Sequence, residues 1–523
     1  MRFENSLRNS SVMMIGQIIN ILLGFLLRTV FIRTLGQEYS GLNGVFESVL
    51  MLLSLAELGF GTSAAFALYK PIADDNKKKI GALMALYRQI YHVIAIVTVV
   101  LGIILIPFLD LLTKNASQTM PYTNVTLIYL LFLTNTVLSY LFSYKRTLIC
   151  AYQMHYINSI NENVCLFVKY ILQGAILLLI VKTDSPDAES LKNAGYIAFM
   201  VIQVLSVFIS NLAIAKKCNK MYPWLKEYSK EKLEKEETDS LKKSVISLLY
   251  QRISSVLVTG TDNIMITYAG IALMGVYYNY QMIIQTVFKL LEKVFQSIMA
   301  SVGDMMVSEG EEHSHKVYKE MNFVTFVVFS VIVIAFAGVM QRFIELWAGK
   351  DWVLSNSVLA IVLFNFFITG MREPNKLVID SAGLFNYLRP KAVFEVIVNL
   401  VMSLLFLVKF KMGIYGVLLG TSASLLSTCF WWEPYVVYKH GLKKKLRTYF
   451  LRYAIYFVFT AIVALLNAWI CSIVPIKGFL GVIICGCVSV AIAGIAIITV
   501  FGRTREFNAI KSRFLSILKE KVG

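Results

Sequence analysis

Ionisable side chains occur inside several of the long apolar runs of this chain. Glu57 is the clearest case, because it stands in the run LSLAELGFGTSAAFALYKP (53–71) and meets no basic residue before Lys70. A charge within hydrocarbon is costly, so such residues normally face a bundle interior or a water-filled cavity and mark a functional site. The charges of this kind that we single out are Arg28, Glu57, Asp262, Lys289, Glu292, Lys293, Arg372 and Glu373.

The elements that position these charges are predicted to be membrane-spanning helices. The chain has 523 residues, of which 57% are hydrophobic and only 16% charged, which excludes an ordinary soluble globular protein. Segments of roughly 20 apolar residues are long enough to cross a bilayer. We expect an all-α polytopic membrane protein of about fourteen spans: 10–34, 41–69, 83–112, 122–144, 158–181, 194–216, 243–269, 272–301, 320–346, 355–384, 391–409, 413–438, 449–474 and 478–501.

The basic residues predict the orientation of these spans. An even number of spans places both termini on one side, and a cytoplasmic N-terminus puts most of the lysines and arginines that lie between spans inside. The net charge of +18 is therefore interpreted as a signal for topology and for anionic lipid, not for nucleic acid. We expect no cleaved signal peptide, and we interpret the seven cysteines as reduced, small hydrophobic residues.

The two halves of the chain repeat one another. At one constant offset, Leu7 matches Leu241, Gln17 matches Gln251, and both Gly36 and Gly41 match glycines, Gly270 and Gly275. Because the offset covers six spans, the halves have the same orientation, which is typical of transporters with a substrate site between two lobes. The predicted domains are an N-lobe (1–216), a cytoplasmic linker (217–242), a C-lobe (243–440), two additional helices (441–502) and an amphipathic cytoplasmic tail (503–523).

The repeat also relates the intramembrane charges. It places Glu57 at the depth of Leu291, within one turn of Lys289, Glu292 and Lys293, and it matches Arg28 with Asp262. We interpret these residues as lining a cavity. For Arg28 the alternative is a side chain that snorkels to the interface.

A third group of charges surrounds Pro374 in the segment TGMREPNKLVIDSAGLF. Proline removes a helical hydrogen bond, so it predicts a bend or a cavity beside Arg372 and Glu373. Lys376 and Asp380, four residues apart, have a structural ion pair as their alternative interpretation. Trp431 and Trp432, beside Glu433 and Pro434, are interpreted as part of an interfacial aromatic belt.

Several kinds of chemistry have no sequence signal. The nucleotide-binding loop G-x-x-x-x-G-K-[ST] does not occur, nor do H-E-x-x-H and G-x-S-x-G, so we expect neither ATP hydrolysis nor an enzyme. His313 and His315 fall in a predicted loop, and we expect no metal site and no cofactor.

Two segments resemble a known family. LGQEYSGLNGVFESVLMLLSLAELGFGTSAAFALYKPIADDNKKKIGALMALYRQIY (35–91) is similar to the corresponding region of bacterial polysaccharide flippases, which transport the repeat units of O-antigen, capsule and exopolysaccharide. GMREPNKLVIDSAGLF (370–385) resembles a second signature of that group, the polysaccharide-transport branch of the multidrug/oligosaccharidyl-lipid/polysaccharide (MOP) exporter superfamily. The resemblance implies a MATE/MOP-like fold of two six-helix lobes with two extra C-terminal helices.

The resemblance also implies a function in cell-surface polysaccharide biosynthesis. It is the flipping of undecaprenyl-pyrophosphate-linked oligosaccharide from the inner to the outer leaflet of the bacterial cytoplasmic membrane by alternating access. Implied partners are this lipid-linked oligosaccharide, membrane lipids, a polysaccharide polymerase and glycosyltransferases.

Individual residues receive roles from two sources. The resemblance carries Arg28 and Arg372 over as cavity cations that hold the pyrophosphate, whereas Lys289 and Lys293 receive this role from their depth alone. Glu57, Asp262, Glu292 and Glu373 are interpreted as counter-charges or ion-coupling groups. The alternatives are a lipid II flippase, a MATE-type drug/cation antiporter and, from another class, a membrane polysaccharide polymerase or glycosyltransferase.

Overall fold

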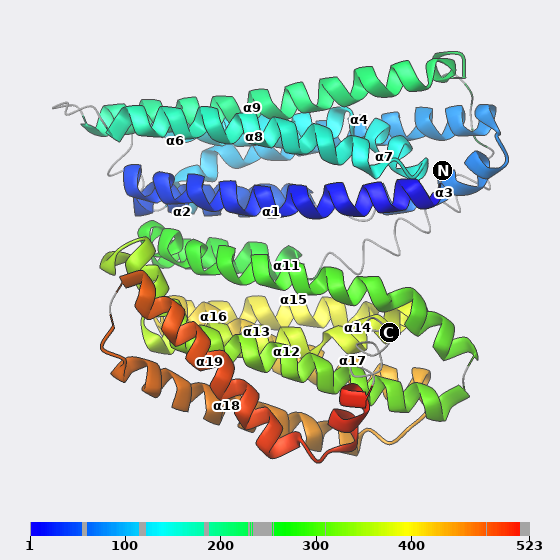
Figure 1. Ribbon diagram of the computed structural model, residues 1–523. Helices are drawn as coiled ribbons and strands as arrows, with labels where there is room; N and C mark the ends of the chain where they lie inside the picture. The colour runs from blue at the N-terminus through cyan, green and yellow to red at the C-terminus, as the bar shows by residue number, and fades with distance from the viewer. Residues whose placement is uncertain are drawn as a thin grey trace. The chain divides into compact units, whose positions relative to one another are not determined.

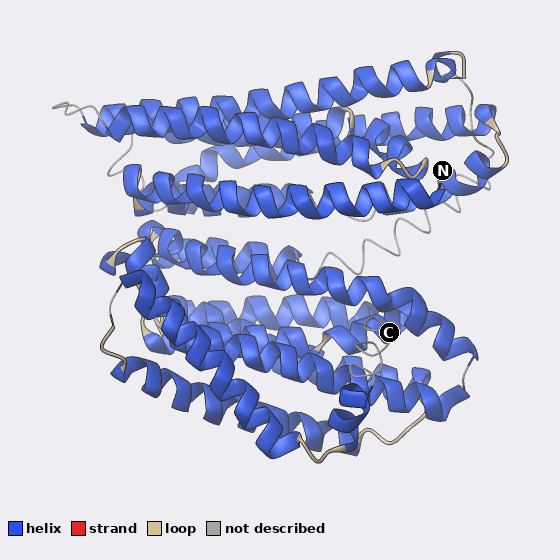
Figure 2. Cartoon of the chain, in the orientation of Figure 1, coloured by secondary structure: helices blue, strands red, loops and turns tan. Residues whose placement is uncertain are grey.

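The computed structural model of the chain describes an all-helical protein. It covers residues 2–54, 60–113, 122–181, 188–228, 231, 233, 254, 256–308, 310–476 and 478–512. Over these residues every regular element is a helix (Figure 2). Ten described stretches are long and apolar enough to span a membrane, and four further helical regions fall at the remaining expected spans: α1, α2 with α3, residues 256–269, and α11. The predicted all-α polytopic architecture is confirmed.

The contacts divide the chain into two compact units, Met1–Gly275 and Val276–Gly523. The labelled helices of the first unit are α1 (Arg2–Thr34), α2 (Gln37–Leu53), α3 (Phe60–Ala73), α4 (Lys77–Leu105), η2 (Ile106–Phe108), α5 (Leu109–Leu112), α6 (Tyr122–Leu141), α7 (Ser143–Ala151), α8 (His155–Val181), α9 (Ala188–Met221) and η4 (Pro223–Lys226) (Figure 1). Within this unit α8 packs on both α1 and α9, and α6 packs on both α9 and α4.

The first unit extends beyond the predicted lobe boundary at residue 243. The helical residues 256–269 belong to it because they pack against α2, where the side-chain amide of Asn263 donates to Ser48 Oγ over 3.0 Å. The hydroxyl of Ser40 likewise donates to the carbonyl of Gly275 over 3.1 Å. Through these contacts residues 256–269 and the first turn of α11 are part of the first unit.

The glycines shared by the two sequence repeats meet at this contact. A Cβ atom on Gly275 would lie 2.1 Å from the carbonyl oxygen of Gln37 and 2.9 Å from the backbone nitrogen of Gly41. A Cβ atom on Gly41 would lie 2.0 Å from the carbonyl oxygen of Ile271. All three distances are too short for a side chain, so α2 and the start of α11 approach this closely only with glycine at both positions.

We therefore expect Gly41→Ala to destabilise the protein. The added methyl group meets backbone rather than a flexible side chain, and overpacking of this kind costs about 1–3 kcal/mol. The measurement is unfolding in detergent, and the control is Gly494→Ala in α19, where a Cβ atom would meet nothing within 4 Å. Equal stability of the two variants would contradict the close contact.

The second unit contains the remaining elements. They are α11 (Ile271–Ser308, whose first turn precedes the unit boundary), α12 (Gly310–Trp347), η5 (Lys350–Trp352), α13 (Asn356–Met371), α14 (Glu373–Ser381), η6 (Leu384–Leu388), α15 (Arg389–Leu404), η7 (Leu405–Lys409), α16 (Ile414–Ser424), η8 (Leu425–Cys429), α17 (Phe430–Val436), η9 (Val437–Gly441), α18 (Arg447–Ile473) and α19 (Gly478–Phe501). The segments η7, η8 and η9 are π-helical.

The two C-terminal helices, α18 and α19, pack on α12. Arg342 of α12 donates hydrogen bonds to the carbonyls of Val474 (2.9 Å) and Ile476 (3.2 Å) in the connection between them. The start of the tail also contacts this unit, because Glu506 pairs with Arg452 at 2.8 Å and the ring of Phe507 lies 6.4 Å from that of Phe323. The described part of the tail, up to residue 512, is thus held by protein contacts, in addition to any membrane surface it was predicted to cover.

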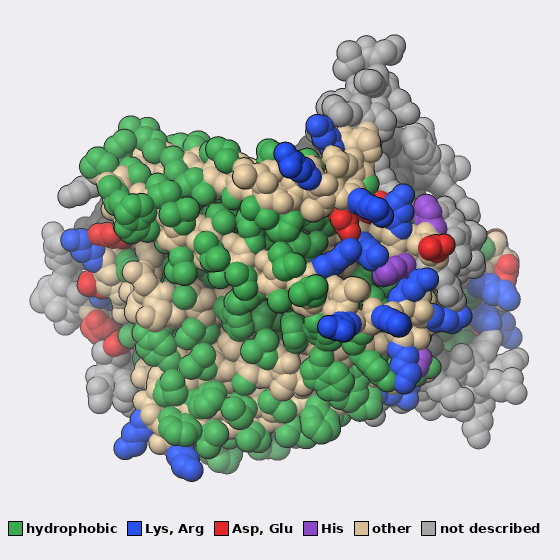
Figure 3. Space-filling model, turned by 90° about the horizontal axis from the view of Figure 1, so that it is seen from below, with side chains coloured by type: hydrophobic (Ala, Val, Ile, Leu, Met, Phe, Trp, Pro, Cys, Tyr) green, Lys and Arg blue, Asp and Glu red, His purple; other side chains and the backbone are tan. Residues whose placement is uncertain are grey.

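Apolar side chains cover much of the molecule. Large hydrophobic residues are exposed along α4, α8, α15, α18 and α19, as expected of surfaces that face lipid. In the view of Figure 3 they form a broad band, while Lys, Arg and His side chains gather toward one end. The chain is a multi-pass membrane protein.

Candidate functional site

The helix that carries Arg372 is broken at that residue. α13 ends at Met371 and α14 begins at Glu373, with Pro374 in the first turn of the new helix. Proline has no N–H to donate back along the helix, so the chain can restart there in a new direction. The interruption predicted from Pro374 is confirmed, and it places Arg372 at the junction of the two segments.

Arg372 is the centre of a buried network of four charged side chains. Its guanidinium binds Glu433 of α17 in a bidentate manner, through Nε at 2.9 Å and Nη2 at 2.6 Å. Lys391 of α15 bridges two carboxylates, at 2.8 Å from Glu395 Oε2 and 3.0 Å from Glu433 Oε1. Arg372 Nη1 also lies 3.9 Å from Glu395 Oε1. We call Arg372, Lys391, Glu395 and Glu433 the ion network.

The ion network is balanced in charge and shielded from solvent. Its two cations face two carboxylates, and the side chains of Arg372 and Glu433 are 13% and 2% exposed. The thiol of Cys429 donates a further hydrogen bond to Glu395 Oε1 over 3.0 Å. Removing charges from water is expensive, and only close, well-directed pairing compensates for it. Each member therefore depends on the others.

The helix that carries Glu433 has an irregular backbone around this residue. The π-helical segment η8 ends at Cys429, directly before α17, and Pro434 lies inside α17 next to Glu433. Such π-helical turns often occur at functional sites. Three candidate spans thus converge here with irregular backbone in two of them.

Glu373 and Lys376 form a separate pair beside the ion network. Lys376 Nζ lies 2.7 Å from Glu373 Oε1 and 5.9 Å from the ring centre of Phe288 on α11. The suggested pair between Lys376 and Asp380 is not formed, since Lys376 uses Glu373 instead. Glu373 is thus a buried partner of Lys376, and its role as a counter-charge or ion-coupling group in transport stays a prediction.

The predicted charges of α11 directly follow Phe288, the residue whose ring lies beside Lys376. Lys289, which follows Phe288, is exposed, as is Lys293, whereas Glu292 is half-buried. Exposed lysines are compatible with a water-filled cavity. The role of Lys289 and Lys293 in substrate binding stays a prediction.

In the first unit Arg28 lies in the interior. It is 8% exposed, and its guanidinium donates to Ser40 Oγ and lies 5.1 Å from the ring centre of Phe31. This placement is that of an interior group, not of a side chain that snorkels to an interface. Asp262, its repeat partner, is buried to the same extent in the helical residues 256–269. Glu57 lies outside the described residues.

Sequence reasoning did not single out several charges that the structure buries in or beside the spans. Lys391, Glu395 and Glu433 belong to the ion network, and Lys169 of α8 is buried with its Nζ 4.8 Å from the ring centre of Tyr170. The spacing of Lys391 and Glu395, four residues apart on one helix face, was a usable signal. The two tryptophans before Glu433 were interpreted as an aromatic belt, and the glutamate beside them was given no role.

Known proteins were compared with the chain by sequence and by structure. No protein-family model matches it, and no curated protein matches it significantly. Among solved structures it is similar to the inward-facing conformation of a multidrug resistance MATE family transporter of the MOP superfamily, with a TM-score of 0.57 and 14% identity over 82% of this chain and 97% of that one. It is also similar to the lipid II flippase MurJ in an inward closed conformation, with a TM-score of 0.59 and 13% identity over 95% of this chain and 99% of that one. The chain therefore has the MATE/MOP-like transporter fold that its sequence predicts.

Proposed function

We propose that this protein is a flippase for oligosaccharides linked to undecaprenyl pyrophosphate, acting in cell-surface polysaccharide biosynthesis. It would move them from the inner to the outer leaflet of a bacterial cytoplasmic membrane, with both of its termini in the cytoplasm. The observation that carries the proposal is the ion network, because it holds two cations, Arg372 and Lys391, buried among apolar spans in a transporter fold.

The ion network suits a pyrophosphate group by its chemistry. Arginine binds phosphate oxygens in the same forked geometry in which Arg372 now binds Glu433, and lysine binds phosphate as a point charge. A pyrophosphate that carries two negative charges could replace the carboxylates as partner of Arg372 and Lys391. Glu395 and Glu433 then hold the cations in place between transport cycles.

The remaining predicted residues complete the proposed pathway. Arg28 of the first unit, with Lys289 and Lys293 of α11, would supply further cations for the head group. The proposed counter-charges or ion-coupling groups are Glu57, Asp262, Glu292 and Glu373. The proposed cycle is alternating access, in which the prenyl tail stays in lipid while the sugar-pyrophosphate head crosses a hydrated path. A polymerase and glycosyltransferases are the proposed partners.

A lipid II flippase is the second candidate, because the similarity to MurJ covers 95% of this chain and thus extends to the two C-terminal helices. The similarity to the MATE transporter covers 82%. Lipid II also presents a polyprenyl pyrophosphate, so the ion network suits both substrates and only the sugars distinguish them.

A substrate comparison tests the proposal. The full chain is reconstituted in liposomes with a fluorescent undecaprenyl-pyrophosphate oligosaccharide, with lipid II or with a cationic dye, and transfer between leaflets is measured by quenching from outside. Transfer of the oligosaccharide is the expected result. Transfer of lipid II alone would favour the second candidate, and export of the dye alone would indicate a drug antiporter.

A further inference from the structure

A basic groove lies in the second unit, where η9 meets the connection to α18. It offers about 320 Å³ of space and is lined by Tyr435, Tyr438, Lys439, Lys443, Lys444 and Leu446. These residues come from the end of α17, from η9 and from the connection to α18. Lys443 takes a left-handed backbone conformation (φ 49°), and the backbone N–H of Lys444 donates to the carbonyl of Tyr438 over 3.0 Å. The lysine-rich connection is thus folded back over the helix end.

One face of the helix that leads into this groove changes from apolar to cationic along its length. Trp431, Tyr435 and Lys439 are spaced by four residues, so they lie on one helical stripe. Trp431 and Tyr435 are 42% and 37% exposed, and the Nζ of Lys439 lies 4.9 Å from the ring centre of Tyr435. An order of tryptophan, tyrosine and lysine is what the boundary between hydrocarbon and lipid head groups selects.

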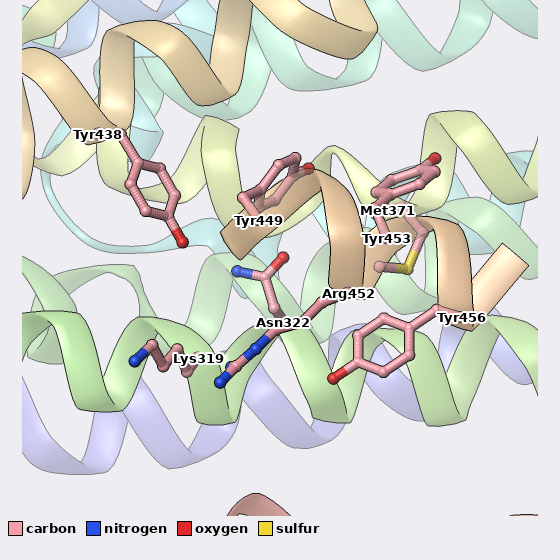
Figure 4. A pocket seen from close by; sticks show the side chains of 8 residues that line it. All are labelled: Lys319, Asn322, Met371, Tyr438, Tyr449, Arg452, Tyr453 and Tyr456. Atoms are coloured by element: carbon pink, nitrogen blue, oxygen red, sulfur yellow. The ribbon is translucent and has the colours of Figure 1, made fainter. Parts of the chain in front are cut away.

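More positive charge stands behind the groove. Tyr438 also lines a small inner pocket with space of about 20 Å³, together with Lys319 and Arg452 (Figure 4). The side-chain oxygen of Asn322, which faces this pocket, is buried and has no hydrogen-bond partner among the described residues.

Two lysines that line the groove, Lys439 and Lys444, have no carboxylate partner among the described residues. Arg452 is paired with Glu506 at 2.8 Å. Among the described residues, neither Lys439 nor Lys444 forms an ion pair, and Lys439 donates instead to the phenolic oxygen of Tyr435. Over the described residues these two lysines therefore keep their positive charge uncompensated by a carboxylate, in contrast to Arg372 and Lys391 of the ion network.

We propose that this groove binds the phosphate of an anionic glycerophospholipid. The phosphate would lie between Lys439 and Lys444, within reach of the hydroxyl of Tyr435, and the acyl chains would follow Tyr435 and Trp431 into the hydrocarbon. The space is that of a small-ligand site, and basic pockets beside membrane helices are suited to lipid head groups. A lipid bound here would fix the connection between η9 and α18.

The test is native mass spectrometry of the full-length protein with added phosphatidylglycerol, phosphatidylcholine or inorganic phosphate. The double variant Lys439→Gln/Lys444→Gln is compared with Lys350→Gln/Lys409→Gln, which removes two exposed lysines of the same unit that do not line the groove. Each lysine near a membrane surface contributes enough attraction that the groove variant is expected to bind phosphatidylglycerol roughly 10- to 30-fold more weakly. The control variant and the binding of phosphatidylcholine are expected to remain unchanged.

Three outcomes would overturn the proposal. Equal losses in both double variants would mean that total charge, not the groove, retains the lipid. Equal binding of phosphatidylcholine and phosphatidylglycerol would show that the groove does not select an anionic head group. If millimolar inorganic phosphate displaces the bound lipid as effectively as phosphatidylglycerol does, the groove is a site for free anions and not for lipid.

Discussion

Replacing Arg372 by methionine is expected to lower the free energy of unfolding by about 3–5 kcal/mol, the usual cost of leaving a buried charge without its partner. The variant would leave Lys391 alone between the carboxylates of Glu395 and Glu433. One uncompensated negative charge would then remain in the interior. Unfolding in detergent, followed as a function of the fraction of denaturing surfactant, measures the loss.

The double variant Arg372→Met/Glu433→Met is the control for this experiment. It removes one cation and one anion together and leaves the pair of Lys391 and Glu395, at 2.8 Å, intact. Replacing a whole buried ion pair by apolar residues is often neutral or even stabilising. We therefore expect most of the lost stability to return. A double variant as unstable as the single one would contradict the pairing of Arg372 with Glu433.

The second large effect concerns the membrane potential. The ion network is neutral when it is empty, because its own carboxylates balance Arg372 and Lys391. In the proposed cycle, the empty transporter would therefore reorient without moving net charge, whereas the outward step would carry the two charges of the pyrophosphate. With the inside negative, this step gains about 4–5 kcal/mol at 100 mV, which corresponds to a roughly 10³-fold shift in the leaflet distribution of the substrate.

Proteoliposomes with a potassium diffusion potential measure this shift directly. Oligosaccharide is expected to collect in the leaflet on the positive side, and reversing the potential is expected to reverse the direction. Liposomes without the protein are the control. A leaflet distribution that ignores the potential but follows an imposed proton or sodium gradient would show that counter-ions compensate the substrate charge.

The sequence predicted the membrane architecture well, because the signals for it are strong and local. Long apolar runs define spans whatever they pack against, and Pro374 predicted a broken helix at Arg372. The glycines shared by the repeats also had a structural cause, since Gly41 and Gly275 meet at a backbone contact. Close packing of two helix backbones requires small residues, so it can be recognised in the sequence.

The partners of the intramembrane charges could not be predicted in the same way. Arg372 was recognised as a functional candidate, but its partner Glu433 is 61 residues away and was hidden beside Trp431 and Trp432. Pairing between helices depends on their rotation and register, which composition does not determine. Lys376 illustrates the same limit within one helix, because it pairs with Glu373, three residues before it, and not with Asp380, four residues after it.

The most direct test of the account is the rate at which the fluorescent undecaprenyl-pyrophosphate oligosaccharide crosses liposomes that contain the wild-type chain or the Arg372→Met/Glu433→Met variant. The two proteins should fold with similar stability, so a difference in transfer rate reports the loss of the Arg372 cation and not a loss of folded protein. We expect transfer by the wild type and a loss of at least tenfold in the variant, the equivalent of about 1.4 kcal/mol. Transfer at equal rates would contradict the assignment of the ion network as the site that holds the pyrophosphate.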